Sequence, residues 1–97
     1  MNTQEMIFTS QAVEAFREII GNTQEVSLIA AEKLRAKIFH KLHLIQHHPI
    51  QGSKTLNVGI DGNFRITTAL SVKIYYKVEE NRTVVLDMLI DKDNKTV

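Results

Sequence analysis

Residues 64–90 constrain the fold most, because three short strand patterns follow one another here with almost no room between them. In each pattern apolar residues alternate with other residues, which is the period of a strand with one buried face. The predicted apolar side comprises Phe64, Ile66, Thr68 and Leu70, then Val72, Ile74, Tyr76 and Val78, then Val84, Leu86, Met88 and Ile90. The sequence therefore predicts an antiparallel sheet with one face in the core and one basic face exposed to solvent, called here the displayed face.

The turn between the first two patterns, at residues 70–71, decides which of their residues are neighbours. A register that keeps both apolar sides together places Arg65 opposite Tyr75 and Thr67 opposite Lys73.

A second turn, at residues 80–82, has a matching register that sets Asp87 opposite Tyr75 and Val85 opposite Lys77. Both turns together predict one polar cluster on the displayed face, made of Arg65, Lys73, Tyr75, Lys77 and Asp87.

Two helical patterns precede the strands. The first begins at Thr9 or Ser10, either of which can cap it, and Gly21 is expected to end it. The second spans residues 23–47, before Pro49 and Gly52. Its apolar positions, three or four residues apart, are Val26, Ala30, Leu34, Ile38, Leu42 and Ile45, widened by Leu28, Ala31 and Phe39.

Residues 6–9 predict a short opening strand, residues 54–60 another, and residues 91–97 a loose polar tail. The order of elements predicts an α+β domain in which an N-terminal helical hairpin packs on a small antiparallel sheet of three to four strands. We expect all 97 residues to form a single domain, with residues 91–97 as its flexible end.

Composition narrows the function classes. The chain has no cysteine, no apolar run long enough to span a membrane and no signal-peptide pattern, so we expect a cytoplasmic protein without membrane contact. The net charge is only +1, but residues 33–77 hold a single acid, Asp61, among many bases. The chain also lacks phosphate-loop and hydrolase motifs, so we expect no small-molecule substrate.

Of the four histidines, at positions 40, 43, 47 and 48, the first three lie on one face of the predicted helix and could share a metal ion. No cysteine or interleaved acid completes such a site, so we expect no metal and no cofactor, and we interpret the histidines as a basic helix end.

Three passages, in this order, resemble the RelE/ParE toxins of bacterial type II toxin-antitoxin systems. They are the opening IFTSQAVEAFREI, the helix end LIQHHPIQG, and the strand block that begins FRI and continues VKIYYKVEENRTVVLDMLI. The resemblance covers nearly the whole chain and implies the RelE/ParE-like fold.

The family has two activities, ribosome-dependent cleavage of messenger RNA and inhibition of DNA gyrase, and the fold does not choose between them. By resemblance Arg65 and Lys73 match basic phosphate-contacting positions, and with Tyr75 they are the candidate catalytic residues. RNA-cleaving members usually carry a further arginine and a tyrosine or histidine in or just past the last strand, where this chain has residues 90–95 of sequence IDKDNK. We therefore favour a ParE-like toxin. An mRNA endonuclease and an inactive relative that only binds antitoxin are the alternatives.

The resemblance also implies a partner, an antitoxin whose C-terminal segment wraps the toxin. The second helix has more apolar residues than one core stripe needs. Those at Leu28, Phe39 and Leu44 predict a surface that such a segment would cover. On the sheet we assign Lys77 and Asp87 to partner binding, with an acid-base role beside Tyr75 as the alternative.

Overall fold

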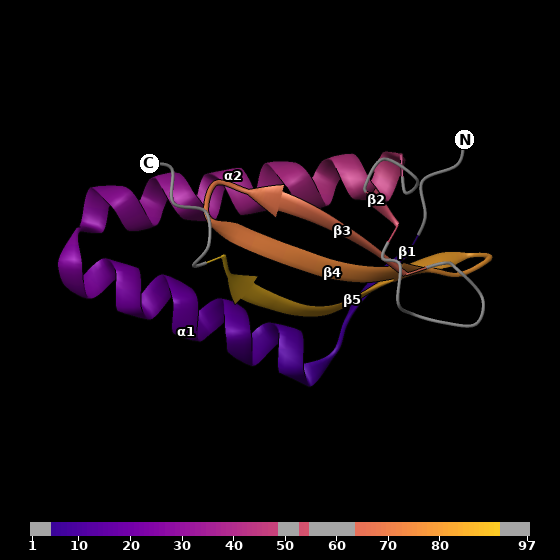
Figure 1. Ribbon diagram of the computed structural model, residues 1–97, viewed down its shortest axis with the longest axis horizontal. Helices are drawn as coiled ribbons and strands as arrows, with labels where there is room; N and C mark the ends of the chain where they lie inside the picture. Colours follow the sequence, from indigo (N-terminus) through magenta and orange to yellow (C-terminus); the bar gives the residue numbers. More distant parts are fainter. Residues whose placement is uncertain (1–4, 49–52, 55–63, 92–97) are drawn as a thin grey trace.

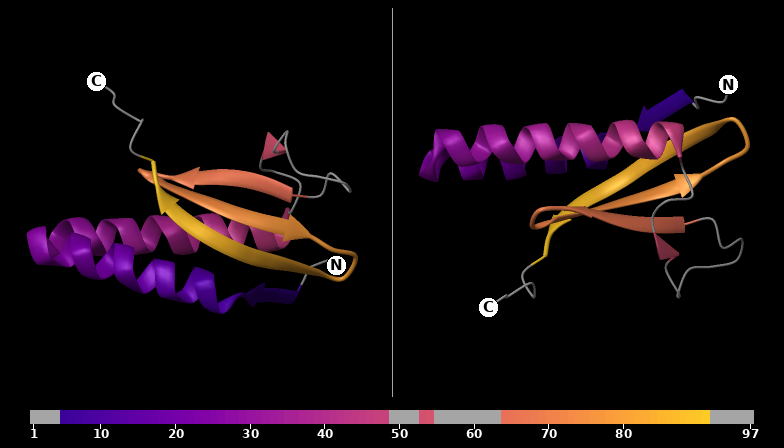
Figure 2. Two further views of the ribbon diagram at one scale, coloured as in Figure 1. Left: turned by 60° about the horizontal axis from the view of Figure 1, so that its bottom comes forward. Right: turned by 90° about the horizontal axis from the view of Figure 1, so that it is seen from above.

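Two helices cover one face of a five-stranded sheet in the computed structural model, which describes residues 5–48, 53–54 and 64–91 (Figure 1). The elements in chain order are β1 (Glu5–Phe8), α1 (Ser10–Val26), α2 (Leu28–His47), β2 (Ser53–Lys54), β3 (Phe64–Ala69), β4 (Val72–Val78) and β5 (Arg82–Ile90). Seen from above, both helices lie on the same side of the sheet (Figure 2). The predicted α+β fold with a helical hairpin on a sheet is confirmed.

The strand order in the sheet is β1-β5-β4-β3-β2. Strands β2 to β5 pair antiparallel, whereas β1 pairs parallel with β5, from Glu5 opposite Arg82 to Phe8 opposite Val85. The predicted antiparallel strands are thus confirmed in β2 to β5. The opening strand lies beside the last one and makes the sheet mixed, with five strands instead of three to four. Most of the second predicted short strand, at residues 55–60, lies outside the described residues.

The helix boundaries differ from the prediction at the hairpin between them. Thr9 caps α1 as expected, since its hydroxyl accepts a hydrogen bond from the backbone N–H of Ala12 at 3.0 Å. However, α1 continues through Gly21, so the prediction that Gly21 ends the helix is wrong. A Cβ atom added at Gly21 would meet no other atom within 4 Å. The break falls at Ser27, which is extended and accepts from the N–H of Ala30 at 3.1 Å to cap α2.

This later break changes which residues of the second helix are buried. Val26 and Ala30, predicted to begin its apolar stripe, are exposed, and the buried stripe is Ala31, Leu34, Ile38, Leu42 and Ile45. These side chains pack with Ala12, Ile19 and Ile20 of α1 against the sheet, where Val72, Ile74 and Tyr76 of β4 are fully buried. The predicted core side of β4 is thus confirmed.

Strand β3 has the opposite orientation to the one predicted. The turn at residues 70–71 has two residues, with Ala69 paired to Val72, and this register places Arg65 opposite Tyr76 and Thr67 opposite Ile74. A slip of one residue moves a strand's side chains to the other face. The predicted pairs of Arg65 with Tyr75 and of Thr67 with Lys73 are therefore wrong, and Phe64 and Ile66 lie on the face away from the helices.

Strand β5 changes orientation partway along its length. Asp87 lies opposite Tyr75 as predicted, but Val85 lies opposite Tyr76 rather than Lys77, because a β-bulge interrupts the register between them. Met88 and Val85 are consequently both buried, while Val84 shares the other face with its partner Lys77. The predicted alternation holds for the end of β5 and fails for its beginning.

None of the described helices is long and apolar enough to cross a membrane.

Candidate functional site

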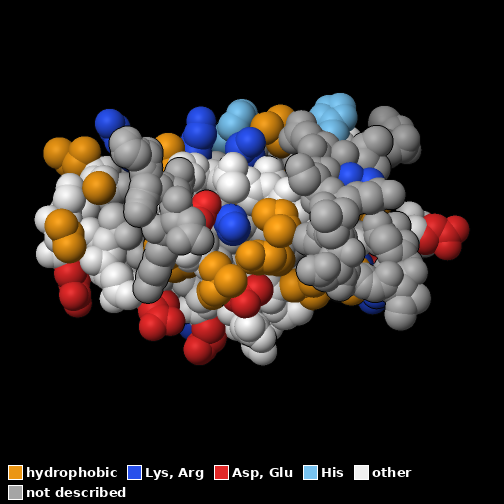
Figure 3. Space-filling view, in the orientation of Figure 1, with side chains coloured by type: hydrophobic (Ala, Val, Ile, Leu, Met, Phe, Trp, Pro, Cys, Tyr) orange, Lys and Arg blue, Asp and Glu red, His pale blue; other side chains and the backbone are white. Residues whose placement is uncertain are grey.

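The face of the sheet that the helices leave uncovered, called here the open face, combines apolar, aromatic and charged side chains. The strand registers place on it Phe64, Ile66, Thr68, Lys73, Tyr75, Lys77, Val84, Asp87 and Leu89. Figure 3 views this face and shows hydrophobic side chains gathered beside a basic and an acidic one. The open face is more apolar than predicted, because the register of β3 brings Phe64 and Ile66 to it.

Four of the five residues of the predicted cluster share the open face. Lys73, Tyr75 and Lys77 alternate along β4, and Asp87 is the cross-strand partner of Tyr75. Arg65 is separated from them, since it pairs with the fully buried Tyr76 and so belongs to the side of the helices. The three candidate catalytic residues Arg65, Lys73 and Tyr75 therefore do not meet on one surface.

Lys77 lies within a local network at the end of the open face. Its ammonium group is 5.2 Å from the centre of the Phe64 ring and 3.7 Å from the carboxylate of Glu79. Glu79 also accepts a hydrogen bond from the guanidinium of Arg82 at 2.6 Å, and this bond is the main reason that its pKa is lowered. Lys77 is thus held at the turn between β4 and β5.

Asp87 connects the sheet to α1. One of its carboxylate oxygens accepts a hydrogen bond from the side-chain amide of Gln11 at 2.8 Å, and the other accepts from the backbone N–H of Met88 at 2.8 Å. The neighbouring carbonyl of Leu86 accepts from the Thr9 hydroxyl at 2.8 Å. These bonds fix the start of α1 against β5. Sequence reasoning assigned Asp87 to partner binding, with an acid-base role as the alternative, and missed this contact with α1.

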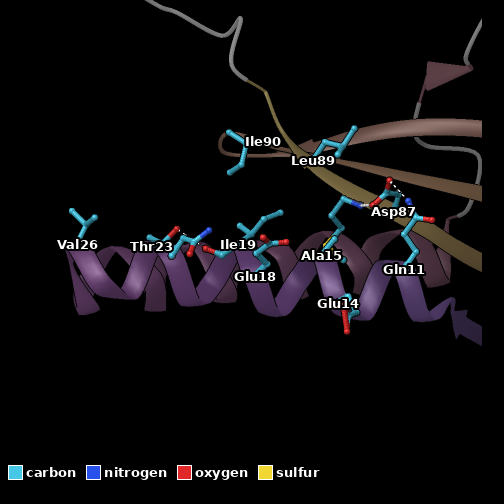
Figure 4. A pocket seen from close by; sticks show the side chains of 12 residues that line it. Gln11, Glu14, Ala15, Glu18, Ile19, Thr23, Val26, Asp87, Leu89 and Ile90 are labelled. Carbon is cyan, nitrogen blue, oxygen red and sulfur yellow. Dashed lines mark hydrogen bonds between the residues drawn. The ribbon is translucent and has the colours of Figure 1, made fainter.

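Beyond these bonds α1 and β5 diverge and leave a groove of about 890 Å³ between them, called here the α1–β5 groove. Figure 4 shows it, with α1 on one side and the end of β5 on the other. Its apolar lining is Ala15, Ile19, Val26, Met88, Leu89 and Ile90, and its polar lining is Gln11, Glu14, Glu18, Asn22, Thr23 and Asp87. Alternation in β5 placed Met88 and Ile90 on the predicted core side, but the break at Ser27 and the course of α1 along β5 were needed to find the groove.

The predicted partner-binding residues of α2 do not form one patch. Leu28 and Phe39 are 56% and 53% exposed, and at about 100° per residue they lie on nearly the same line along the helix. Phe39 also stacks on Phe16 of α1, with ring centres 5.6 Å apart. Leu44 is half-buried and about 140° around the helix from Phe39, so it belongs to another side.

The tip of the helical hairpin is a further apolar surface that the sequence did not reveal. Val26 and Ile29 are 86% and 72% exposed and flank the cap residue Ser27, next to Leu28. Sequence reasoning assigned Val26 to the core stripe, because it continued the second helix across Ser27.

The histidines of α2 lie at its C-terminal end, where the rings of His43 and His47 are 4.4 Å apart between centres. Within the described part of the chain, no three His, Cys, Asp or Glu side chains are grouped as a metal site would require. Together with the lysines of α2 the histidines form a basic edge opposite the acidic edge of α1, and both edges are visible in Figure 3.

Comparison with known proteins places this geometry in a class. A family model described as the ParE toxin of the type II toxin-antitoxin system parDE matches residues 6–94. A solved structure titled "Chromosomal ParDE TA system from P. aeruginosa" superimposes with a TM-score of 0.72, at 14% identity, over 91% of this chain and 96% of that one. Curated protein sequences give no significant match.

The fold and the match define the toxin component of a type II toxin-antitoxin system. The chain belongs to the ParE toxin family, and the predicted resemblance is confirmed.

Proposed function

We propose that this ParE-family chain arrests growth by binding a macromolecular target, with DNA gyrase as the first candidate, and that a cognate antitoxin in the cytoplasm neutralises it. The observation that carries the proposal is the register of β3. It puts Arg65 on the side of the helices, while Lys73 and Tyr75 lie on the open face.

Cleavage of RNA by this family's chemistry needs several groups around one phosphate: a base for the 2′-hydroxyl, a cation for the developing charge and an acid for the leaving oxygen. On the open face, Lys77 is drawn toward Glu79 and Phe64, and Asp87 accepts bonds from Gln11 and Met88. This arrangement supports a binding surface rather than a nuclease centre.

The open face has the composition of an interface. Apolar and aromatic side chains such as Ile66, Tyr75 and Leu89 lie beside the cation of Lys73, and such mixtures form the energetically dominant parts of protein interfaces. We assign the target contact to this face. The antitoxin contact we assign to α1 and α2, where Leu28 and Phe39 remain exposed.

The experiment is to induce the chain in a bacterial host and to follow incorporation of labelled thymidine and labelled amino acid. We expect thymidine incorporation to fall first and co-expressed antitoxin to restore growth. Early loss of protein synthesis with site-specific transcript breaks that vanish in Arg65→Ala would instead establish an mRNA endonuclease. Normal growth with soluble, folded protein would indicate an inactive relative.

The antitoxin contact has its own test. Leu28→Asp or Phe39→Asp should abolish antitoxin binding in titration calorimetry while leaving the fold intact, because each puts a charge into an apolar contact. Unchanged affinity of both variants would remove α2 from the interface.

A further inference from the structure

We propose that a pocket between β4, β5 and the start of α1 binds an arginine side chain of the macromolecular target, with the Asp87 carboxylate as the anion and the Tyr75 ring as the wall. This inference rests on the proposed function and names the chemistry that the open face recognises. Three observations carry it: a pocket beside an aromatic ring, a carboxylate without a cation, and acceptor sites left on both oxygens of that carboxylate.

The pocket lies at the edge of the open face, where it adjoins the α1–β5 groove. Its volume is about 520 Å³. The residues that line it are Thr9, Gln11, Tyr75, Leu86, Asp87 and Leu89. We call it the Tyr75–Asp87 pocket, because these two residues are cross-strand partners and place a ring and a carboxylate side by side.

The Asp87 carboxylate has no cation to balance it among the described residues. The two ion pairs at the turn between β4 and β5 both use Glu79 as the acid. Lys73 shares the open face, but it lies opposite Leu89, one cross-strand pair further along, and forms no ion pair with Asp87. A carboxylate left uncompensated at a contact surface favours a partner group of opposite charge.

The carboxylate is already oriented by two donors. The Gln11 amide donates to one oxygen and the backbone N–H of Met88 donates to the other, each at 2.8 Å, and Figure 4 shows the bond from Gln11. A carboxylate has about four acceptor sites, so about one remains on each oxygen. A guanidinium presents two parallel N–H donors that match both oxygens, whereas the ammonium of lysine lacks this fork. The remaining sites therefore favour arginine.

Tyr75 supplies the aromatic wall of the pocket. Its side chain is half-buried, and within the part of the chain that the structure describes its hydroxyl has no hydrogen-bond partner. A planar guanidinium stacks on an aromatic face and is attracted to it when the two lie within about 6 Å. Leu89 offers an apolar surface for the aliphatic stem of the same side chain. Tyrosine and arginine are also the residues enriched at the dominant contacts of protein interfaces.

The neighbouring charge of Lys73 restricts the target surface further. Like charges across an interface oppose association, so an arginine beside Asp87 binds best when the target also brings an acid to Lys73. The open face therefore fits a target surface on which an arginine has an acidic neighbour, and the two opposite charges fix the orientation of the complex.

The first test titrates the full chain with N-acetylarginine amide and follows the side-chain signals of Gln11 and Tyr75 by NMR. N-acetylcitrulline amide, which has nearly the same shape and no charge, is the matched probe. We expect the arginine probe to shift both signals and the citrulline probe to shift neither. Asp87→Asn should abolish the response, whereas Glu25→Gln, at an exposed position of α1 outside the pocket, should leave it unchanged.

Two results of this titration would overturn the pocket. Equal shifts from both probes would show that the guanidinium charge is not recognised. Shifts spread evenly over the exposed acids of α1 would show an unspecific attraction of cations to the acidic edge.

The second test measures the inhibition of supercoiling by purified DNA gyrase. Asp87→Asn, which keeps one acceptor oxygen, should raise the amount of chain needed for half-maximal inhibition by about tenfold. Tyr75→Leu leaves Asp87 and its bonds in place and should raise this amount by about threefold, because only the aromatic wall is removed. Glu25→Gln should inhibit as the wild type does, and thermal unfolding checks that all three variants are folded. Full inhibition by both pocket variants would overturn the inference.

The outcomes distinguish this inference from the proposed function. A wild-type chain that binds the arginine probe specifically but leaves gyrase unaffected would overturn the proposed function and keep the pocket as an arginine site. Gyrase inhibition that is insensitive to Asp87→Asn and Tyr75→Leu would keep the proposed function and overturn the pocket as its contact. Variants that inhibit gyrase normally but bind the antitoxin weakly would assign the pocket to the antitoxin and also overturn the inference.

Discussion

The two faces of the sheet are built from the same strands but differ in what their side chains are available to do. On β4 the neighbours Tyr75 and Tyr76 point to opposite faces, and Tyr76 is fully buried under the helices while Tyr75 stays half-exposed beside Asp87. The face of the sheet under the helices is closed by packing, so its side chains contribute only to stability. The open face and the α1–β5 groove retain the groups that can recognise another molecule.

The largest expected difference is between the two tyrosines. Tyr76→Ala should lower the free energy of unfolding by about 3–5 kcal/mol, because it removes a fully buried aromatic ring and leaves a cavity. Tyr75→Ala, the matched change on the open face, should cost less than about 1 kcal/mol. Urea denaturation of both variants checks this, and similar losses would mean that the two faces are not separate in stability.

A charge reversal on the open face should reduce activity without unfolding the protein. Lys73→Glu should raise the amount of protein needed for half-maximal growth arrest by about tenfold, through loss of a favourable contact and a new repulsion in the target complex. Lys33→Glu makes the same change on the exposed side of α2 and should retain full activity. Loss of activity in Lys33→Glu alone would move the target surface to the helices.

The turn that sets the register of β3 is strained at one residue. Leu70 has a φ of 57° in the two-residue turn, a conformation that favours glycine, and its side chain is exposed. Leu70→Gly should therefore raise the free energy of unfolding by about 1 kcal/mol. Ser71→Gly in the same turn should not stabilise, because Ser71 does not have a positive φ. Thermal unfolding of both variants distinguishes relief of strain from a general effect of glycine.

The turn between β4 and β5 should make the free energy of unfolding slightly dependent on pH. The hydrogen bond from Arg82 lowers the pKa of Glu79 below its ordinary value of 4.5, so the charged pair stabilises the folded state above that value. The contribution is lost as the pH falls through the lowered pKa. The difference in unfolding free energy between wild type and Glu79→Gln should therefore grow as the pH rises, and a difference independent of pH would exclude the ion pair as its cause.

How far the sequence predicts this molecule depends on local detail at single residues. Alternation was sufficient for β4, because every second residue from Val72 to Tyr76 is large, apolar and buried. It failed for β3, where the choice between two registers depended on whether Leu70 adopts a left-handed conformation, which is unusual for leucine. It failed for the first half of β5, because a single sequence carries no pattern that marks a β-bulge.

The candidate site residues were likewise placed correctly where alternation was sufficient and wrongly where it failed. Lys73, Tyr75, Lys77 and Asp87 were placed together by alternation alone, and the structure keeps them on one face. Arg65 was lost from that face by one residue of register, and with it the predicted phosphate site. The α1–β5 groove needs the path of α1 beside the last strand, which depends on contacts between residues far apart in the chain, such as the bond from Thr9 to Leu86.

The open face and the groove meet at Asp87 and Leu89, which belong to both. A molecule bound in the groove would therefore also contact residues of the open face.

Supercoiling by purified DNA gyrase, measured with increasing amounts of this chain, is the most direct test of the central claim. The account predicts inhibition that antitoxin relieves and that Lys73→Glu weakens, with messenger RNA on ribosomes left intact. Unaffected supercoiling together with cleavage of ribosome-bound messenger RNA would contradict it.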